Sequence, residues 1–309
     1  MKVKICQKIA QLLLVLLGLS FISFALMYIT PGDPAQHRLI AQGIVVTPEV
    51  LEQTREEMGL NQPFIRQYFT WLGQALVGNL GISYRTGHPV TAMLGQALSH
   101  TVLLAGISFG SALGMAIFLS VLSLLKRGRI IQYIIRICTT TGNALPNFLL
   151  ATVFMYLFCI RWNIFPIIAG GTWKGLFLPV FSLSFPLFSL LTKQLYAQMT
   201  EEMEKPYVQA ALARGMKERT VVCSLVLRHA LIIVIPLLGL TIGGLFGGSV
   251  VIENLFGWPG IGDMVMDAIS ARDYPVIQAF VLVSGGLYVI ISFVLDLLYL
   301  YLSGLETSS

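Results

Sequence analysis

The sequence predicts an all-α membrane protein with six transmembrane helices. Hydrophobic residues make up 56% of the 309 positions and charged residues only 11%, whereas a soluble domain carries about 25% charged residues. Several apolar stretches are long enough, at about 20 residues, to cross a hydrocarbon core of roughly 30 Å. Backbone groups in lipid must be hydrogen-bonded internally, so these stretches are expected to be helices. The predicted spans are residues 9–29, 101–125, 137–160, 175–197, 230–252 and 276–303.

The first span follows three lysines, Lys2, Lys4 and Lys8, as the apolar part of a signal peptide would. It is long enough to cross a bilayer, and no small-residue cleavage site follows it. We therefore expect residues 1–30 to form a retained N-terminal transmembrane helix.

Residues 31–99 are expected to form an external region with two short helices. Thr47 is a helix cap, Pro48 stands at the first helical position and Glu49 lies in the first turn, so a helix should begin here and end near Gly59. Residues 63–77 place aromatic and aliphatic side chains at helical spacing, which predicts an amphipathic helix at the membrane interface.

The distribution of basic residues predicts the orientation. With a cytoplasmic N-terminus, thirteen of the 20 Lys and Arg residues fall in inside segments, and the cluster at 126–136 is the densest. Both termini are then cytoplasmic. The net charge of +5 follows this topology and predicts no nucleic-acid partner. Residues 100–305 are expected to form a core with five further spans and a cytoplasmic loop at 200–229.

This loop carries the most informative motif. Residues 207–215 read Y-V-Q-A-A-L-A-R-G and are followed by a basic stretch. The pattern predicts a short helix, a break at Gly215, where a backbone turn is permitted, and a second short helix. Small alanine side chains allow a partner surface to dock closely.

The segment resembles the EAA loop of ABC importer permeases, which docks in a groove of an ATP-binding subunit. Gln209 stands where the family has Glu, and Arg228 where many members have Pro. By this resemblance, the residues that couple the chain to the ATPase are Tyr207, Gln209, Ala210, Ala211, Gly215, Leu225, Leu227 and Arg228.

The resemblance extends over nearly the whole chain, most clearly at 253–262, which read E-N-L-F-G-W-P-G-I-G, and at 272–278, which read R-D-Y-P-V-I-Q. It identifies the chain as a dipeptide, oligopeptide or nickel importer permease with the type I ABC importer fold. It implies an external loop that shapes the outer mouth, with Glu253, Trp258, Pro259, Gly260 and Gly262.

The same resemblance implies an assembly in the inner (cytoplasmic) membrane of a bacterium. Its partners would be a second, homologous permease in a heterodimer, two ATP-binding subunits and an extracytoplasmic solute-binding protein. The chain has no G-x-x-x-x-G-K-[ST] loop. We therefore expect it to be no enzyme and to bind no cofactor, with ATP and Mg used by the partner subunits.

The expected cargo is nickel or a metal chelate, because residues 145–148, 170–173 and 252–254 resemble nickel permeases; a dipeptide or oligopeptide is the alternative. His37, His88 and His100 lack metal-ligand spacing. The four cysteines show no CxxC spacing. No protein metal site is predicted.

Two further features leave alternatives open. Gly239, Gly243 and Gly247 recur at four-residue spacing, which serves either helix packing within the chain or a moving subunit interface. Asp296 is the only carboxylate deep in a span; it either pairs with a basic group or relays protons. An ion-coupled secondary transporter would need more such residues, a channel a filter-like loop, and an intramembrane enzyme a catalytic motif.

Overall fold

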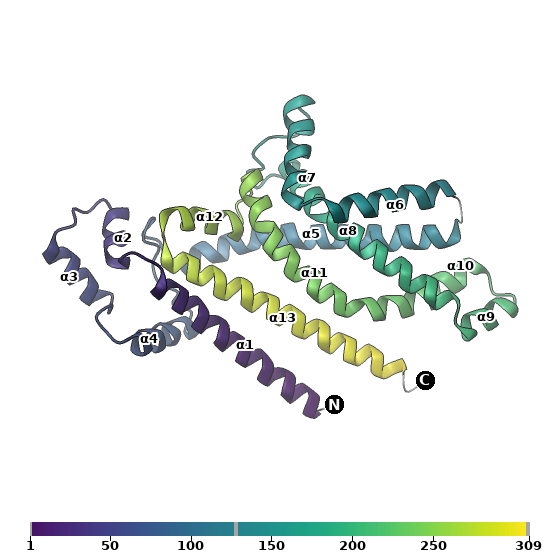
Figure 1. Cartoon of the computed structure of the whole chain (residues 1–309), viewed down its shortest axis with the longest axis horizontal. Helices are drawn as coiled ribbons and strands as arrows, with labels where there is room; N and C mark the ends of the chain where they lie inside the picture. The colour runs from purple at the N-terminus through teal and green to yellow at the C-terminus, as the bar shows by residue number, and fades with distance from the viewer. Residues whose placement is uncertain (1, 127–128, 307–309) are drawn as a thin grey trace. The chain divides into compact units, whose positions relative to one another are not determined.

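The computed structural model describes residues 2–126 and 129–306, and the regular elements of these residues are helices (Figure 1). An isolated bridge joins Ile82 and Pro89. The elements are α1 Lys2–Ile29, α2 Pro34–Ala41, α3 Pro48–Glu57, α4 Phe64–Leu76, α5 Val90–Leu125, α6 Arg129–Ala144, α7 Asn147–Phe154, the π-helix η1 Met155–Arg161, α8 Trp173–Met203, α9 Pro206–Ala213, α10 Glu218–Thr220, the π-helix η2 Val221–Val226, α11 Leu227–Phe256, α12 Ile261–Ala271 and α13 Tyr274–Glu306.

Five of the expected spans are single helices that are long and apolar enough to cross a membrane. Their apolar side chains are largely exposed on α1, where Leu14, Ile22 and Leu26 are each more than half exposed. Such a surface is stable only in lipid. In the described residues the spans are Ile9–Ile29, Val90–Leu125, Trp173–Met203, Glu218–Phe256 and Tyr274–Tyr299.

The remaining expected span, 137–160, which is the third along the chain, is broken. The segments Ile135–Gly142 and Asn147–Arg161 meet at an angle of 111°. The break falls at Pro146, which has no backbone N–H to continue the helix and whose carbonyl instead accepts from the amides of Leu149 and Leu150 at the start of α7. The number of spans is therefore five, or six if the bent pair crosses.

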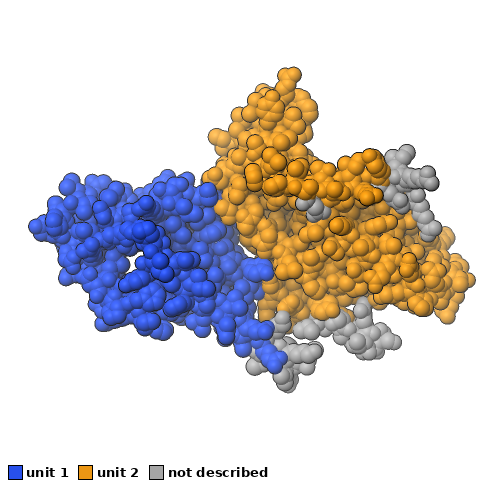
Figure 2. Space-filling model, in the orientation of Figure 1, with its two compact units in different colours: residues 1–101, 259–290 blue, residues 102–258, 291–309 orange. Residues whose placement is uncertain are grey.

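The chain forms two compact units, coloured separately in Figure 2. Unit 1 comprises residues 1–101 and 259–290, and unit 2 comprises residues 102–258 and 291–309. Helices α5 and α13 each contribute residues to both units. The boundaries expected from the sequence, at 30 and 99, remain a prediction.

The core of unit 2 is built around α8. This helix packs against α6, α7 and α11, and Leu183, Leu187, Leu191 and Leu195 form a buried stripe at four-residue spacing. Pro179 and Pro186 lie inside α8; neighbouring helices at such positions can satisfy the freed carbonyls.

Unit 1 contains three short helices between α1 and α5. Helix α3 begins and ends as expected, with Thr47 Oγ1 accepting from the Val50 amide at 3.4 Å. Helix α4 is also as expected. Helix α2 is additional: Asp33 caps it by accepting from the Ala35 amide at 2.9 Å and forms an ion pair with Arg55 at 2.7 Å. This contact raises the pKa of Arg55, chiefly through its hydrogen bond to Asp33.

A buried carboxylate links the two sequence segments of unit 1. Asp273 accepts from Ser83 Oγ at 2.5 Å, from the Tyr84 amide at 3.0 Å and from the Arg85 amide at 3.3 Å. Burial at this junction raises the pKa of Tyr84, so its hydroxyl stays protonated. Residues 83–85 are thus fastened to the turn between α12 and α13.

Candidate functional site: the α8–α11 loop and the helices beside it

The loop that follows α8 contains α9, which ends in a specific cap at Gly215. The Gly215 amide donates to Leu212 O at 2.9 Å and the Met216 amide donates to Ala211 O at 3.2 Å. This pair of bonds is a Schellman motif, which requires a left-handed residue. Gly215 provides it with φ of +86°. The break predicted at Gly215 is confirmed.

One face of α9 is tied to the core of unit 2. Val208 and Ala211 are buried in the same cluster as Val221 and Val222 of η2. The Glu202 side chain at the end of α8 is only 2% exposed and pairs with Lys205 at 2.6 Å. It also accepts a hydrogen bond from the Tyr207 hydroxyl. A buried carboxylate with both an ion pair and a hydrogen bond holds its neighbours firmly, because loss of either contact leaves its charge poorly compensated.

The opposite face of α9 is exposed and combines small alanines with longer polar side chains. Ala210, Ala213 and Arg214 point outward, and Gln209 donates to Met203 O at 2.7 Å while remaining exposed. Of the other residues expected to couple, Tyr207 and Arg228 are exposed, Leu225 and Leu227 are half-buried and Ala211 is buried. The loop therefore presents a shallow surface on a firmly anchored helix.

The segment after Gly215 differs from the expected second short helix. Residues Glu218–Phe256 form one continuous helix, made of α10, η2 and α11. It includes a π-helical stretch at Val221–Val226, and such stretches are rare and often lie at functional positions. Only the turn of residues 214–217 separates α9 from this helix, and α9 also packs against η2. A displacement of α9 is therefore transmitted to a full transmembrane span.

The residues expected at the outer mouth are mostly buried. Glu253 is 0% and Trp258 1% exposed. A second Schellman motif ends α11, with the Trp258 amide donating to Glu253 O at 2.8 Å and Gly257 at φ +58°. In unit 1, Pro259 is exposed and Gly260 and Gly262 are buried. The Ile261 amide donates to Thr101 Oγ1 at 2.8 Å. These residues position the chain where α12 begins.

The glycines of α11 lie in different surroundings. A Cβ on Gly239 would contact Leu295 Cδ1 at an ordinary 3.6 Å, and one on Gly247 would meet nothing within 4 Å; Gly243 is half-buried. A tighter approach lies at Gly142 of α6, where a Cβ would lie 2.7 Å from Ser189 Cβ. No local signal in the sequence marks Gly142, because its contact is with the distant helix α8.

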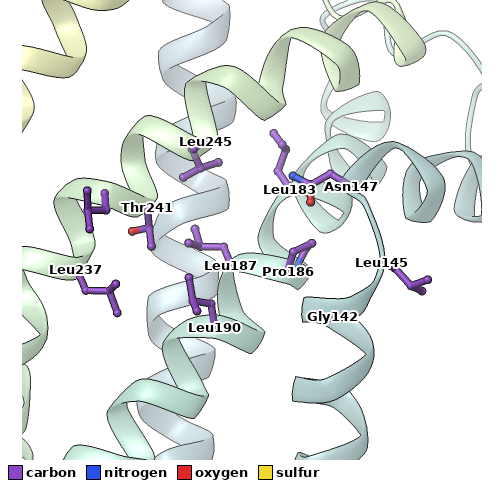
Figure 3. A pocket seen from close by; sticks show the side chains of 12 residues that line it. Gly142, Leu145, Asn147, Leu183, Pro186, Leu187, Leu190, Leu237, Thr241 and Leu245 are labelled. Carbon is purple, nitrogen blue, oxygen red and sulfur yellow. The ribbon is translucent and has the colours of Figure 1, made fainter.

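A cavity of about 380 Å³ lies beside the broken span in unit 2. Figure 3 shows its wall of leucines from α8 and α11, with Asn147 entering from α7 and Leu145 pointing away at the break. Gly248 leaves room for the Asn147 amide, whose Nδ2 lies 3.0 Å from the position of a Cβ there. Thr241 donates to Leu238 O at 2.9 Å, so its hydroxyl proton is used within α11.

The described residues contain no group of three or more His, Cys, Asp or Glu side chains that could hold a metal ion. Cys138, Cys159 and Cys223 are free thiols. His37 lies 3.3 Å from Arg272 Nη1 and beside the Tyr274 ring. Asp296 is half-buried on α13, and its role stays a prediction.

Comparison with known proteins gives matches along the chain. Residues 112–304 match the family described as the binding-protein-dependent transport system inner membrane component, and residues 1–105 match the corresponding N-terminal family. A metal-staphylopine import system permease protein of Staphylococcus aureus is 34% identical over 295 residues, 95% of this chain and 94% of that protein.

Two other relatives differ from it in named cargo. A nickel import system permease protein of Staphylococcus aureus is 33% identical over 295 residues, 96% of this chain and 89% of that protein. A protein of Brucella suis named as a peptide permease is 32% identical over 297 residues, 92% of each chain.

Proposed function

Since the chain belongs to the family of binding-protein-dependent transport system inner membrane components, we propose that it is a permease subunit that moves nickel or a metal chelate by alternating access. The exposed face of α9, which is anchored through Glu202 and packed against the helix that continues into α11, is the single observation that carries the mechanism. This arrangement links the proposed docking surface on α9 to α11, which borders the cavity of about 380 Å³.

The other components of the transporter are proposed to be separate partner proteins. Two ATP-binding subunits hydrolyse ATP with Mg and dock on α9 of this chain and on the equivalent helix of a second, homologous permease. A solute-binding protein delivers cargo at the outer mouth, near Trp258 and Gly260. The chain itself binds no cofactor in this scheme, and both of its termini are cytoplasmic.

The mechanism then follows from rigid connections. When the ATP-binding subunits close, they displace α9, and its ties to Glu202 carry α8 with it. The same displacement moves α11, because α9 packs against η2 in the continuous helix Glu218–Phe256. Both helices line the cavity in Figure 3, so the cavity changes shape with the state of the ATPase. Rigid-body motion of this kind is a common form of switching.

Nickel or a metal chelate is the proposed cargo because two relatives are named for metal-staphylopine and nickel import. A dipeptide or oligopeptide is the second candidate, favoured by the relative named as a peptide permease. Uptake of radiolabelled nickel and of a labelled dipeptide in a knockout strain separates them. Loss of peptide uptake with normal nickel uptake would reverse the assignment.

The docking role is tested by changing the exposed face of α9 without changing its buried face. Ala210→Trp places a large side chain on that surface and should abolish retention of the ATP-binding subunits. Gly215→Pro removes the amide that donates to Leu212 O and cannot adopt φ of +86°. It should uncouple ATP hydrolysis from uptake while the protein stays in the membrane.

The matched control is Gln53→Trp, which introduces the same large side chain at an exposed position of α3. It should keep the ATP-binding subunits attached. Co-purification of the subunits, ATPase rate and cargo uptake are measured for all three variants. Unchanged uptake by the α9 variants would rule out docking at this helix.

A further inference from the structure

A second cavity in unit 2, of about 840 Å³, is lined by α5, α6 and α8. It differs from the leucine-lined cavity in chemistry, because its wall carries two cationic side chains and several hydroxyl groups. The cations are Arg136 on α6 and Lys193 on α8, and the nearby hydroxyl groups include Thr140 on α6 and Tyr196 on α8. No Asp or Glu lines this cavity in the part of the chain that the structure describes.

The hydrogen-bond donors come in two matched pairs. Arg136 and Thr140 are four residues apart on α6, and Lys193 and Tyr196 are three apart on α8, so each pair shares one helix face. Thr139 and Thr192 also line the wall, but their hydroxyl protons are donated to Arg136 O and Phe188 O. The remaining donors are charged or hydroxyl groups and suit an oxyanion.

Neither Arg136 nor Lys193 forms an ion pair with any carboxylate among the described residues. Lys193 lies within the candidate span Trp173–Met203, and Arg136 lies within the segment Ile135–Gly142. Cations in spans are costly unless they face a partner or a hydrated cavity, and they mark binding sites. Two cations facing one cavity therefore call for an anion.

The depth of the cavity indicates which anion is at hand. Arg136 directly precedes the apolar stretch 137–160, and Lys193 is four residues from the end of the stretch 175–197, about 6 Å along a helix. From these positions the long Arg136 and Lys193 side chains can extend to the level of the phospholipid phosphates. The adjoining ends of α5 and α6 lie at the same end of unit 2 as α9 and α10 (Figure 1).

We propose that this cavity is a binding site for a phosphate group, supplied by the headgroup of an anionic phospholipid in the leaflet next to α9. Arg136 and Lys193 neutralise the phosphate, and Thr140 and Tyr196 donate hydrogen bonds to its oxygens. Basic pockets between transmembrane helices bind anionic headgroups in this way. The bound headgroup connects α6, which belongs to the broken span, to α8.

The test uses the full chain, purified with its partner subunits and reconstituted in nanodiscs of phosphatidylcholine with or without phosphatidylglycerol. Bound phosphatidylglycerol is counted by native mass spectrometry as its proportion is varied. Loss of each cation should weaken retention about 5-fold, so Arg136→Gln with Lys193→Gln should weaken it about 25-fold. Lys193→Arg keeps the charge and should retain the lipid.

Arg161→Gln is the matched control, because Arg161 is an exposed cation at the end of η1 that does not line the cavity. It should bind phosphatidylglycerol as the unchanged protein does. A second arm adds inorganic phosphate to phosphatidylcholine nanodiscs and follows thermal stability. Stabilisation by free phosphate, lost in the double variant, supports the anion site and assigns it to a soluble phosphate. Equal lipid retention by the double variant and the unchanged protein would overturn the proposal.

Discussion

At the scale of single residues, two carboxylates contact the same segment of unit 1 in different surroundings. Asp273 is 2% exposed and accepts three hydrogen bonds from residues 83–85. Asp267 makes a 3.1 Å ion pair with Arg85, but both side chains are more than half exposed. Hydrogen bonds to a buried charge contribute far more to stability than an exposed ion pair does.

We therefore predict that Asp273→Asn destabilises unit 1 by about 1–3 kcal/mol, because its NH2 group would face one of the two backbone N–H groups with a donor. Asp267→Asn should cost less than about 1 kcal/mol. Limited proteolysis between residues 77 and 88 and thermal unfolding in detergent measure the difference. Equal protease sensitivity of the two variants would contradict the role given to Asp273.

At the scale of elements, α4 has two apolar faces. Phe64, Tyr68 and Trp71 pack on aromatic rings of α1. The other face exposes Ile65, Phe69 and Leu76, which recur at helical spacing beside the half-buried Leu72. An exposed apolar stripe on a short helix is typical of a helix that lies in the membrane interface. The expectation of an interfacial helix at 63–77 stays a prediction.

This orientation predicts opposite environments for two exposed residues of α4. In a cysteine-free background, a polarity-sensitive dye on Phe69→Cys should report an apolar environment because it enters the lipid. The same dye on Gln74→Cys should report water, since Gln74 is exposed and hydrogen-bonds Asn79. Emission spectra of both variants in liposomes make the comparison. Water-like spectra at both positions would place α4 away from the bilayer.

The sequence predicted the elements whose signals are local. Thr47, Pro48 and Glu49 mark the start of α3, and Gly215 marks the end of α9, because caps depend on neighbouring residues. Hydropathy predicted a span at 137–160 but not its bend at Pro146, since prolines also lie inside the continuous helix α8. The contact of α6 with α8 at Gly142 and the burial of Glu253 depend on residues distant in sequence.

At the scale of the whole molecule, the bent pair of α6 and α7 determines the topology. Among the described residues, five helices are long and apolar enough to cross, and the pair supplies a sixth crossing only if it passes through the bilayer. An even number of crossings places both termini on one side. An odd number separates them, which would contradict the orientation inferred from the basic residues.

We predict that reporters fused to the two termini give signals from the cytoplasm. Cysteine at Lys217, in the α9–α10 turn, should be labelled from the same side, and cysteine at Gln53, on α3, from the opposite side. Both positions are exposed. Membrane-impermeant labelling of intact cells measures this. Termini on opposite sides would mean that the segment Ile135–Gly142 with Asn147–Arg161 enters and leaves the same face.

The discontinuous course of unit 1 also determines the order in which the protein can be completed during translation. Residues 1–101 leave the ribosome first, yet Asp273, on which residues 83–85 depend, follows only after the whole of segment 102–258. At about 5–20 residues per second, that interval is on the order of ten seconds. A nascent chain released before residue 259 therefore keeps Ser83 and the amides of Tyr84 and Arg85 without their acceptor, which leaves this segment open to proteases that remove unfinished membrane proteins.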